Sequence, residues 1–549
     1  MRPSLSLKGN DETLKDEGFE LAKELFLSGT REFERGNLIA AETHLSESLN
    51  LVPNRESTKH NLALVYAALA EELIIVAKVS EAAEQLRKSL DLWTDNPIAW
   101  CNLGCALENL GQRGEAIRAL ERAVELDPGY MSAWSNLGSV LFDEGRPDEA
   151  LACFQQAVGI EPSSPVSQIK LSATLNALGR PAEAAKALER VLSESPESPE
   201  LLSSYARTLR SLNRHKEAIA TLDRLLSICP EDADAHWDRA FSQLALGDFL
   251  DGWADLEWRW QRKDRFIRPR EFSQPLWLGD HPLEGKRVLL HGEQGFGDVI
   301  QFVRYATLVK ELGADVVLEV YLSLRELVQN SFPDLRVIVR GEELPNFDFH
   351  CPLMTLPLAF RTTLESVPSP ECYLVTPEES AVRWRDRLGK KLRPRIGLVW
   401  SGRDTHGNDA KRSMPAKLLT ALMTDEYEFH SLQKDVRASD QGALESLGIK
   451  QWDRYLLDFS DTAALCQLMD VIVSVDTSVA HLSGALGKRT LILLPFASEY
   501  RWLTDRTDSP WYPTASLFRQ KLDGDWPEIL TRIRQALPTY LRSDGSGDG

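Results

Sequence analysis

A period of 34 residues runs through the first half of this 549-residue sequence. Trp100 and Trp134 are one period apart, and Asn102-Leu-Gly104 recurs as Asn136-Leu-Gly138. The same interval separates Gly111, Gly145 and Gly179, with Asn213 and Gly247 after them; Ala116, Ala150, Ala184 and Ala218; and Pro128, Pro162, Pro196 and Pro230. One repeat of this length cannot bury its apolar face alone, so the period predicts a stack of similar units.

These repeated residues resemble the tetratricopeptide repeat, whose unit is a pair of antiparallel helices. Glycine would end the first helix of each pair, alanine would let the two helices pack closely, and proline would separate the units. We expect about six units between residues 25 and 235, the second of them about seven residues longer than the others. The resemblance implies a superhelix whose concave face binds a peptide or protein, although a purely structural scaffold has the same pattern.

A degenerate seventh unit is expected from His236 to about Arg262. It contains Trp237, Trp253, Trp258 and Trp260, which is more apolar surface than a solvent-facing end unit requires, so we predict that it packs on the next domain. The expected segments are a flexible N-terminus (1–20), the repeat superhelix (21–265), a linker (266–284), two α/β halves (285–390 and 391–540) and a flexible tail (541–549).

Composition excludes several classes of protein. A net charge of −19 argues against a general nucleic-acid binder, which would carry a basic surface. The seven cysteines are thinly scattered and indicate a reducing compartment, and Cys101 and Cys105 fit small core residues. No apolar run approaches the roughly 20 residues that span a bilayer, and the first residues lack a signal-peptide core. These features predict a soluble cytoplasmic protein without a membrane span.

Regular alternation of strands and helices begins at Arg287. The expected strands cover residues 288–290, 315–320, 336–339, 347–351, 395–400, 428–433, 471–475 and 490–495; the expected helices cover 299–312, 324–330, 381–388, 415–423, 461–469, 478–486 and 526–537. Two such series, each opening with a strand and a polar loop, predict two Rossmann-like halves that face a cleft.

The turn after the first of these strands reads Gly292-Glu-Gln-Gly-Phe-Gly-Asp298. It is neither a P-loop nor Gly-x-Gly-x-x-Gly, so an ATPase or a nucleotide-dependent dehydrogenase is weakly supported. Gly295 and Gly297 allow close approach of the backbone to another group. Asp298 would either cap the helix that follows or act as a general base.

Two later segments predict an anion site. Val471–Val475 is a buried strand followed by Asp476, Thr477 and Ser478, which can cap a helix whose N-terminus points into the crevice. The loop of residues 401–413 is rich in donors, and its Arg403, Lys411 and Arg412 could hold a diphosphate. The plain alternatives are an ordinary capped helix and a solvated loop.

Together, the glycine turn with Asp298, the basic loop and Asp476-Thr-x-x-x-His481 resemble the heptosyltransferase-type glycosyltransferases of the GT-B fold, over about residues 285–537. With the repeats in front, the whole chain resembles bacterial fusions that include protein glycosyltransferases, among them the kind that modifies flagellin, and its layout is similar to that of O-GlcNAc transferase. The resemblance implies that Asp298 is the base and that Arg412, Lys411, Gln433, Asp476, Thr477, Ser478 and His481 bind the donor. Ser478 stands where the family usually has glycine.

We therefore expect a metal-independent glycosyltransferase that moves a sugar from a nucleotide-sugar substrate to a protein acceptor, without a cofactor. Cationic groups and a helix N-terminus would stabilise the leaving diphosphate. Asp523-Gly-Asp525, just before the last helix, is interpreted as a turn and cap rather than a metal site. Two alternatives stay open: a non-catalytic repeat adaptor, and an enzyme whose acceptor is a glycan such as lipopolysaccharide.

Overall fold

The computed structural model describes residues 17–262, 269–405 and 407–542. Most of the two predicted flexible ends, 1–20 and 541–549, lies outside these residues, although helix α1 already begins at Glu17 and the last helix ends at Arg542. The chain forms two compact units, Met1–Ser204 and Tyr205–Gly549. Of the helices in the described residues, none is long and apolar enough to cross a membrane.

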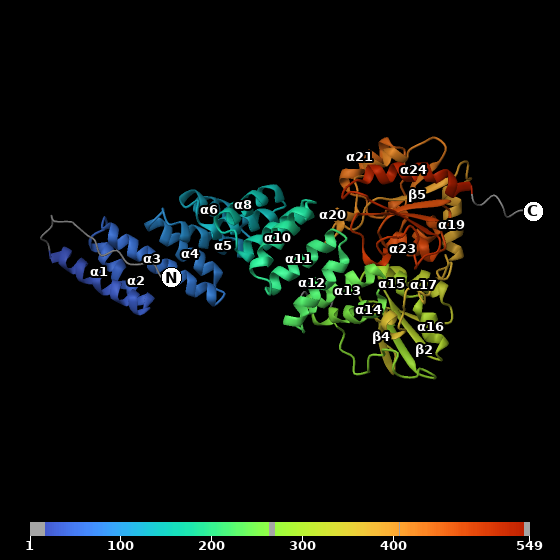
Figure 1. Cartoon of the computed structure of the whole chain (residues 1–549), viewed down its shortest axis with the longest axis horizontal. Helices are drawn as coiled ribbons and strands as arrows, with labels where there is room; N and C mark the ends of the chain where they lie inside the picture. The colour runs from blue at the N-terminus through green and yellow to red at the C-terminus, as the bar shows by residue number, and fades with distance from the viewer. Residues whose placement is uncertain (1–16, 263–268, 406, 543–549) are drawn as a thin grey trace, which may run out of the picture. The chain divides into compact units, whose positions relative to one another are not determined.

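The first unit is made of helix pairs that follow one another along the chain (Figure 1). They are α1 (Glu17–Arg35), α2 (Leu38–Leu51), α3 (Glu56–Ile75), α4 (Val79–Leu92), α5 (Pro97–Asn109), α6 (Arg113–Leu126), α7 (Met131–Asp143), α8 (Pro147–Ile160), α9 (Pro165–Ala177) and α10 (Pro181–Glu194), with α11 (Pro199–Ser211) crossing the unit boundary. The predicted extra length of the second repeat lies in α3, which has 20 residues and is longer than the other helices of the stack.

The periodic glycines end the first helix of a pair, as the sequence predicts. Gly111 and Gly145 have φ values of 74° and 75°, a left-handed conformation that costs glycine little. Asn213 holds the equivalent position with φ 56°, and asparagine tolerates this region better than other side chains. Glycine also allows contact within a pair, because a Cβ on Gly104 would lie 2.5 Å from Leu120 Cγ.

The tryptophan-rich seventh repeat belongs to the second compact unit, Tyr205–Gly549. Its helices are α13 (Ala233–Leu246) and α14 (Phe249–Leu256), preceded by α12 (His215–Ile228) and followed by the 3₁₀ helix η1 (Glu257–Gln261). Trp253 is 1% exposed and packs edge-on against Phe302, Tyr500 and Trp511 of the α/β part. The predicted junction is therefore confirmed for Trp253. Trp258 stacks on His236 within the repeat instead.

The first α/β half has a parallel sheet in the order β3-β2-β1-β4. Its strands are β1 (Arg287–His291), β2 (Asp315–Val320), β3 (Arg336–Val339) and β4 (Phe349–Pro352), and its helices are α15 (Phe296–Phe302), α16 (Tyr305–Glu311), η2 (Leu322–Leu324), α17 (Arg325–Ser331), η3 (Leu353–Thr355) and α18 (Leu356–Ala359). The chain before the strands also joins this sheet: Leu276, in the predicted linker 266–284, bridges His350 in parallel. Residues 263–268 of that region lie outside the described residues.

The prediction of one helix over 299–312 was wrong. The chain turns at Val303 and Arg304 and separates α15 from α16. The Arg304 side chain is buried, and its guanidinium donates to the carbonyl of Gln301 at 2.8 Å and to that of Trp511 at 2.6 Å. The break therefore lies where a buried guanidinium is bound by carbonyls of α15 and of the segment before β9, as a buried charged group requires.

The second half has a parallel sheet in the order β6-β5-β7-β8-β9. Its strands are β5 (Arg395–Val399), β6 (Glu428–Ser431), β7 (Val471–Val475), β8 (Thr490–Leu494) and β9 (Ala515–Arg519); its helices are α19 (Glu378–Leu388), α20 (Asp409–Arg412), η4 (Ala416–Leu422), α21 (Ala438–Ser446), η5 (Asp453–Tyr455), α22 (Phe459–Gln467), α23 (Ser478–Ala485), η6 (Tyr500–Trp502) and α24 (Trp526–Arg542). β9 and α21 were not predicted, and the helix expected over 415–423 is the 3₁₀ helix η4.

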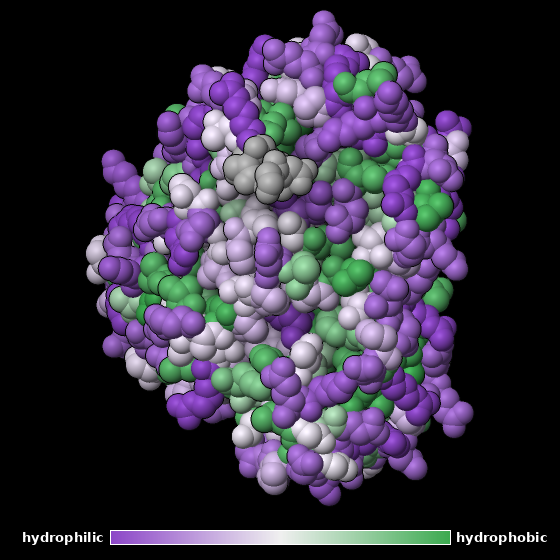
Figure 2. Space-filling view, turned by 90° about the vertical axis from the view of Figure 1, so that its right-hand side faces the viewer, coloured by the Kyte–Doolittle hydropathy of each residue, from purple (hydrophilic) through white to green (hydrophobic). Residues whose placement is uncertain are grey.

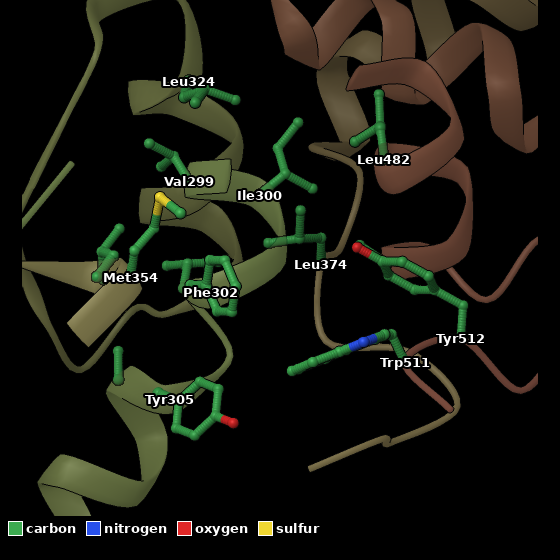
Figure 3. Packing of buried hydrophobic residues seen from close by; sticks show 14 of the residues in the cluster. Val299, Ile300, Phe302, Tyr305, Leu324, Met354, Leu374, Leu482, Trp511 and Tyr512 are labelled. Carbon is green, nitrogen blue, oxygen red and sulfur yellow. The ribbon is translucent and has the colours of Figure 1, made fainter. Parts of the chain in front are cut away.

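The apolar core continues from one half to the other. Figure 3 shows Ile300 of α15 facing Leu482 of α23, with Leu374 beside them. Helix α19, which the predicted boundary at residue 390 assigned to the first half, belongs with the second, because Arg383 and Trp384 both donate to Asp461 of α22, at 2.8 and 2.9 Å. On the face drawn in Figure 2, apolar residues form small separate patches among polar ones.

Candidate functional site

Two helix N-termini meet where the sequence predicts the site. Helix α15 starts directly after the glycine turn that follows β1, and α23 starts after β7. They touch through Gly297: a Cβ at this position would lie 3.0 Å from His481 Cδ2 and 3.7 Å from the Ser478 Cα. Gly297 thus permits the close backbone approach that the sequence indicates, and the group that lies against it is α23.

Asp298 has both carboxylate oxygens engaged. Its Oδ2 accepts a hydrogen bond of 2.8 Å from the Gly295 backbone N–H, and its Oδ1 accepts one from Arg501 Nη2. The first contact caps α15, which is the structural role that the sequence left open. The second is a charge-assisted pair across the two halves. The role of Asp298 as a base stays a prediction.

Arg501 is a member of the site that sequence reasoning missed. Besides Asp298, its guanidinium donates to Gln301 Oε1 at 2.6 Å and to Glu499 Oε1 at 2.5 Å. Burial acts to lower the pKa of Arg501, but the charges of Glu499 and Asp298 keep it well above the ordinary value. Burial raises the pKa of the Glu499 carboxyl to about 7 even beside this cation. The sequence offered one indication of its role: Arg501 lies in the loop after the buried strand β8, and α/β folds bind ligands at the carboxyl ends of such strands.

His481 is a neutral imidazole in this site. It is 6% exposed, and its Nδ1 lies 2.9 Å from the Tyr512 hydroxyl. Burial lowers its pKa well below the ordinary value, and the nearby positive charges of Arg501, Arg304 and Arg412 lower it further. Trp502 stacks on the ring with centroids 5.3 Å apart. His481 can therefore offer a ligand a hydrogen bond but no charge.

The other residues of the predicted anion site surround the start of α23. Thr477 is its N-cap in extended backbone conformation, and the Thr477 Oγ1 lies 3.4 Å from Ser474 Oγ. The Arg412 Nη1 donates to the backbone carbonyl of Asp476 at 3.2 Å, which brings the basic loop to this helix end. Lys411 precedes Arg412 on α20 and is half-buried. A cation beside a helix N-terminus is the expected composition of a diphosphate site.

Gln433 makes its contacts inside the protein. Its Nε2 donates to the Ser401 carbonyl at 2.8 Å and to the Ser401 hydroxyl at 2.9 Å, and only 6% of the residue is exposed. These bonds hold the base of the 401–413 loop, so Gln433 positions the loop that carries Arg412. Its predicted contact with a donor nucleotide stays a prediction.

Two more titratable groups lie on the glycine turn. Glu293 pairs with the fully buried Arg259 at 2.9 Å, and burial raises the pKa of Glu293 to about 7. Its Oε2 is buried and has no hydrogen-bond partner among the described residues. Burial lowers the pKa of His291 to about 3, with the charge of Arg270 adding to the effect. Farther away, Asp525 Oδ1 accepts a bond of 3.2 Å from Glu528 N–H and caps α24, as predicted.

Comparison with known proteins supports the repeats. Residues 101–165 and 175–240 each match a family model described as tetratricopeptide repeat. The chain is also 26% identical over 330 residues to Protein FlbA of Caulobacter vibrioides, a match that covers 56% of this chain and 55% of FlbA. The chain thus spans about half the length of this curated relative.

Solved structures similar to the chain include MamA, at 24% identity over 32% of this chain and 93% of MamA with a TM-score of 0.28. YrrB, described as a TPR protein with an unusual peptide-binding site, matches at 21% identity over 35% of this chain and 95% of YrrB with a TM-score of 0.30. The family models and the observed helix pairs together identify the N-terminal half of the chain as a solenoid of tetratricopeptide repeats.

Proposed function

We propose that the chain is a glycosyltransferase of the GT-B type that transfers a sugar from a nucleotide-sugar donor to a hydroxyl of a protein held by the repeats. The meeting of α15 and α23 carries this proposal, because Gly297 against His481 brings the candidate base Asp298 beside the candidate diphosphate site. Two parallel sheets whose strands β1 and β7 lead into these helices match the crevice at which α/β folds bind ligands.

The donor diphosphate would lie at the N-terminus of α23. Arg412 already reaches this end through the Asp476 carbonyl, and Lys411 is its neighbour on α20. Positive charge and backbone N–H groups fixed in advance stabilise a leaving diphosphate in the transition state. The proposal needs no metal for this step.

Asp298 would accept the proton of the attacking hydroxyl. This requires one of its oxygens to become available, since Gly295 and Arg501 occupy both. The protein acceptor would bind on the tetratricopeptide repeats, because stacked repeats present an extended surface for a peptide or protein. Flagellin is the first acceptor to test, given the resemblance of the chain to flagellin-modifying fusions.

A repeat adaptor without catalysis is the second candidate. The observation that favours it is that Asp298 pairs with Arg501 and Gln433 with Ser401, both inside the protein. A purely structural α/β half would show such contacts. This candidate predicts protein binding by the repeats and no turnover of any nucleotide sugar.

A donor screen on the full chain separates the candidates. Thermal shifts with UDP-, ADP-, GDP- and CMP-sugars identify the donor, and release of the nucleotide is then followed with flagellin or lipopolysaccharide present. A glycosyltransferase should show a higher melting temperature with one class of donor and should release the nucleotide of that donor. Transfer to lipopolysaccharide alone would replace the protein acceptor with a glycan, and no shift and no release would leave the adaptor.

A further inference from the structure

Arg501 connects the candidate base to the candidate phosphate site. Its side chain is 10% exposed and lies on η6, in the loop that follows β8 of the second half. From there it reaches Asp298 and Gln301 on α15 of the first half. The neighbouring Tyr500 packs edge-on against Trp253 and Phe241 of the seventh repeat, which holds this loop in place.

The same guanidinium is held near the start of α23, because Gly297, the residue before its partner Asp298, would place a Cβ 3.7 Å from the Ser478 Cα. Its positive charge depresses the pKa of His481, after burial itself, and the adjacent Trp502 stacks on the His481 ring. On the other side, the charge of Asp476 helps to raise the pKa of Glu499, which pairs with Arg501. Arg501 therefore lies within electrostatic reach of both Asp298 and the residues that would surround a diphosphate.

We infer that Arg501 is a positioning residue that exchanges the Asp298 carboxylate for the donor diphosphate, so that donor binding releases the base. This inference rests on the proposed function. Arg501 contacts Asp298 through Nη2, while its Nε and Nη1 donate to Gln301 and Glu499. A guanidinium N–H binds a carboxylate or a phosphate oxygen in the same way, and a diphosphate carries the greater charge. When Arg501 turns to the diphosphate, Asp298 Oδ1 loses its partner and can take the proton of the acceptor hydroxyl, while Oδ2 keeps the Gly295 cap. The donor then binds before the base becomes competent.

The inference predicts how two substitutions interact. In the full chain, the affinity for inorganic pyrophosphate is measured by calorimetry for the parent, D298N, R501Q and the double variant. D298N removes the competitor for Arg501, so pyrophosphate should bind at least about threefold more tightly. R501Q removes a charge-assisted contact and should weaken binding roughly tenfold or more. In the double variant the gain from D298N should disappear.

Simple repulsion between Asp298 and the anion predicts a different result. In that case D298N strengthens binding by the same factor with or without Arg501, and this outcome overturns the exchange. R506Q is the matched control, because Arg506 pairs with Asp508 at the surface five residues farther on. Its affinity should equal that of the parent.

Loss of a buried cation leaves Glu499 unpaired, so the cycle is repeated with E499Q/R501Q in place of R501Q, which keeps the net charge of the parent. Melting temperatures establish that each variant is folded. A parent that binds neither pyrophosphate nor ADP, UDP or GDP overturns the donor site and this inference together. Binding without coupling between positions 298 and 501 overturns the exchange alone and leaves the glycosyltransferase proposal standing.

Discussion

At the scale of single residues, burial decides the charge states in the candidate site. Burial raises the pKa of Glu293 and of Glu499 to about 7, although each pairs with an arginine. The same effect keeps His481 neutral. The positive charge available to a diphosphate therefore comes from arginine and lysine side chains and from the α23 N-terminus.

Replacing Asp298 by Asn tests the base directly. Asn has a similar shape, and its one amide oxygen can keep the contact with the Gly295 N–H, so we expect a folded protein. It cannot accept the proton, so single-turnover transfer with saturating donor should slow by at least about a hundredfold. D523N, at an exposed carboxylate near α24, should transfer at the parent rate. A D298N rate within a few-fold of the parent would make Asp298 a cap only, and the search for a base would move to Glu293.

Arg412 should contribute directly to diphosphate affinity. Its guanidinium lies at the Asp476 carbonyl, where a ligand at the start of α23 would meet it. R412A should weaken pyrophosphate binding by about 1.5–3 kcal/mol, the usual value of one charge-assisted hydrogen bond. K417A, at an exposed lysine on η4, removes the same charge outside the crevice and should leave the calorimetric affinity unchanged. Equal losses of pyrophosphate affinity in R412A and K417A would mean that Arg412 acts only through its charge and makes no direct contact with the ligand.

His430 gives a pH dependence of stability with a definite sign. Burial, with the charges of Lys450 and Arg395, lowers its pKa to about 4, from about 6.5 in the unfolded chain. Below pH 6.5 the unfolded state binds a proton that the folded state excludes, so this contribution to stability falls until about pH 4. Between pH 7 and pH 5 the parent should lose about 2 kcal/mol more than H430Q in urea unfolding. Parallel pH profiles would contradict this assignment.

At the scale of elements, the site depends on how closely α15 and α23 approach. The two helices are fixed by apolar contacts such as Ile300 against Leu482, visible in Figure 3. Their N-terminal ends meet at a glycine, where no side chain keeps them apart. The close approach of these two helix ends thus depends on the absence of a Cβ at Gly297.

A pair of glycine substitutions tests this contact. G297A places a methyl group 3.0 Å from His481 Cδ2, so His481 or α15 must move, at a cost of about 1–3 kcal/mol of stability. G295A has an ordinary φ of −71° and its nearest neighbour at 3.4 Å, so it should stay within about 0.5 kcal/mol of the parent. Urea unfolding compares them, and pyrophosphate affinity should fall in G297A alone. Equal stabilities would show that the helix ends are loosely packed.

At the scale of the whole molecule, the boundary between compact units falls inside the repeats, at Ser204 and Tyr205. The last helix pair, α13 and α14, therefore belongs with the α/β halves. Trp253 of α14 covers Phe302, Tyr500 and Trp511, and Tyr500 is next to Arg501. Removing these helices would uncover apolar surface beside the candidate site.

Two truncations test this division of the molecule. A fragment that starts at Pro199, the first residue of α11, should be monodisperse and bind pyrophosphate as the full chain does. A fragment that starts at residue 269 lacks α13 and α14 and should aggregate. Light scattering and calorimetry compare them. The longer fragment should also transfer sugar to a protein acceptor more slowly than the full chain, and full-rate transfer would remove the recruiting role of the preceding repeats.

Much of the local structure could be predicted from the sequence, because the spacing of residues reflects the geometry of the helix, turn or strand that they form. Glycines at the repeat period mark left-handed helix ends such as Gly111 and Gly145, and the apolar run Val471–Val475 forms a buried parallel strand. Asp298 and the Asp476–His481 segment could be singled out for the same reason, since each follows such a strand. The contacts of Arg501 with Asp298, 203 positions away, and of Gly297 with His481 could not be predicted from the sequence and are seen in the folded chain. Those contacts depend on how the two sheets and their loops pack, and no short period in the sequence encodes that arrangement.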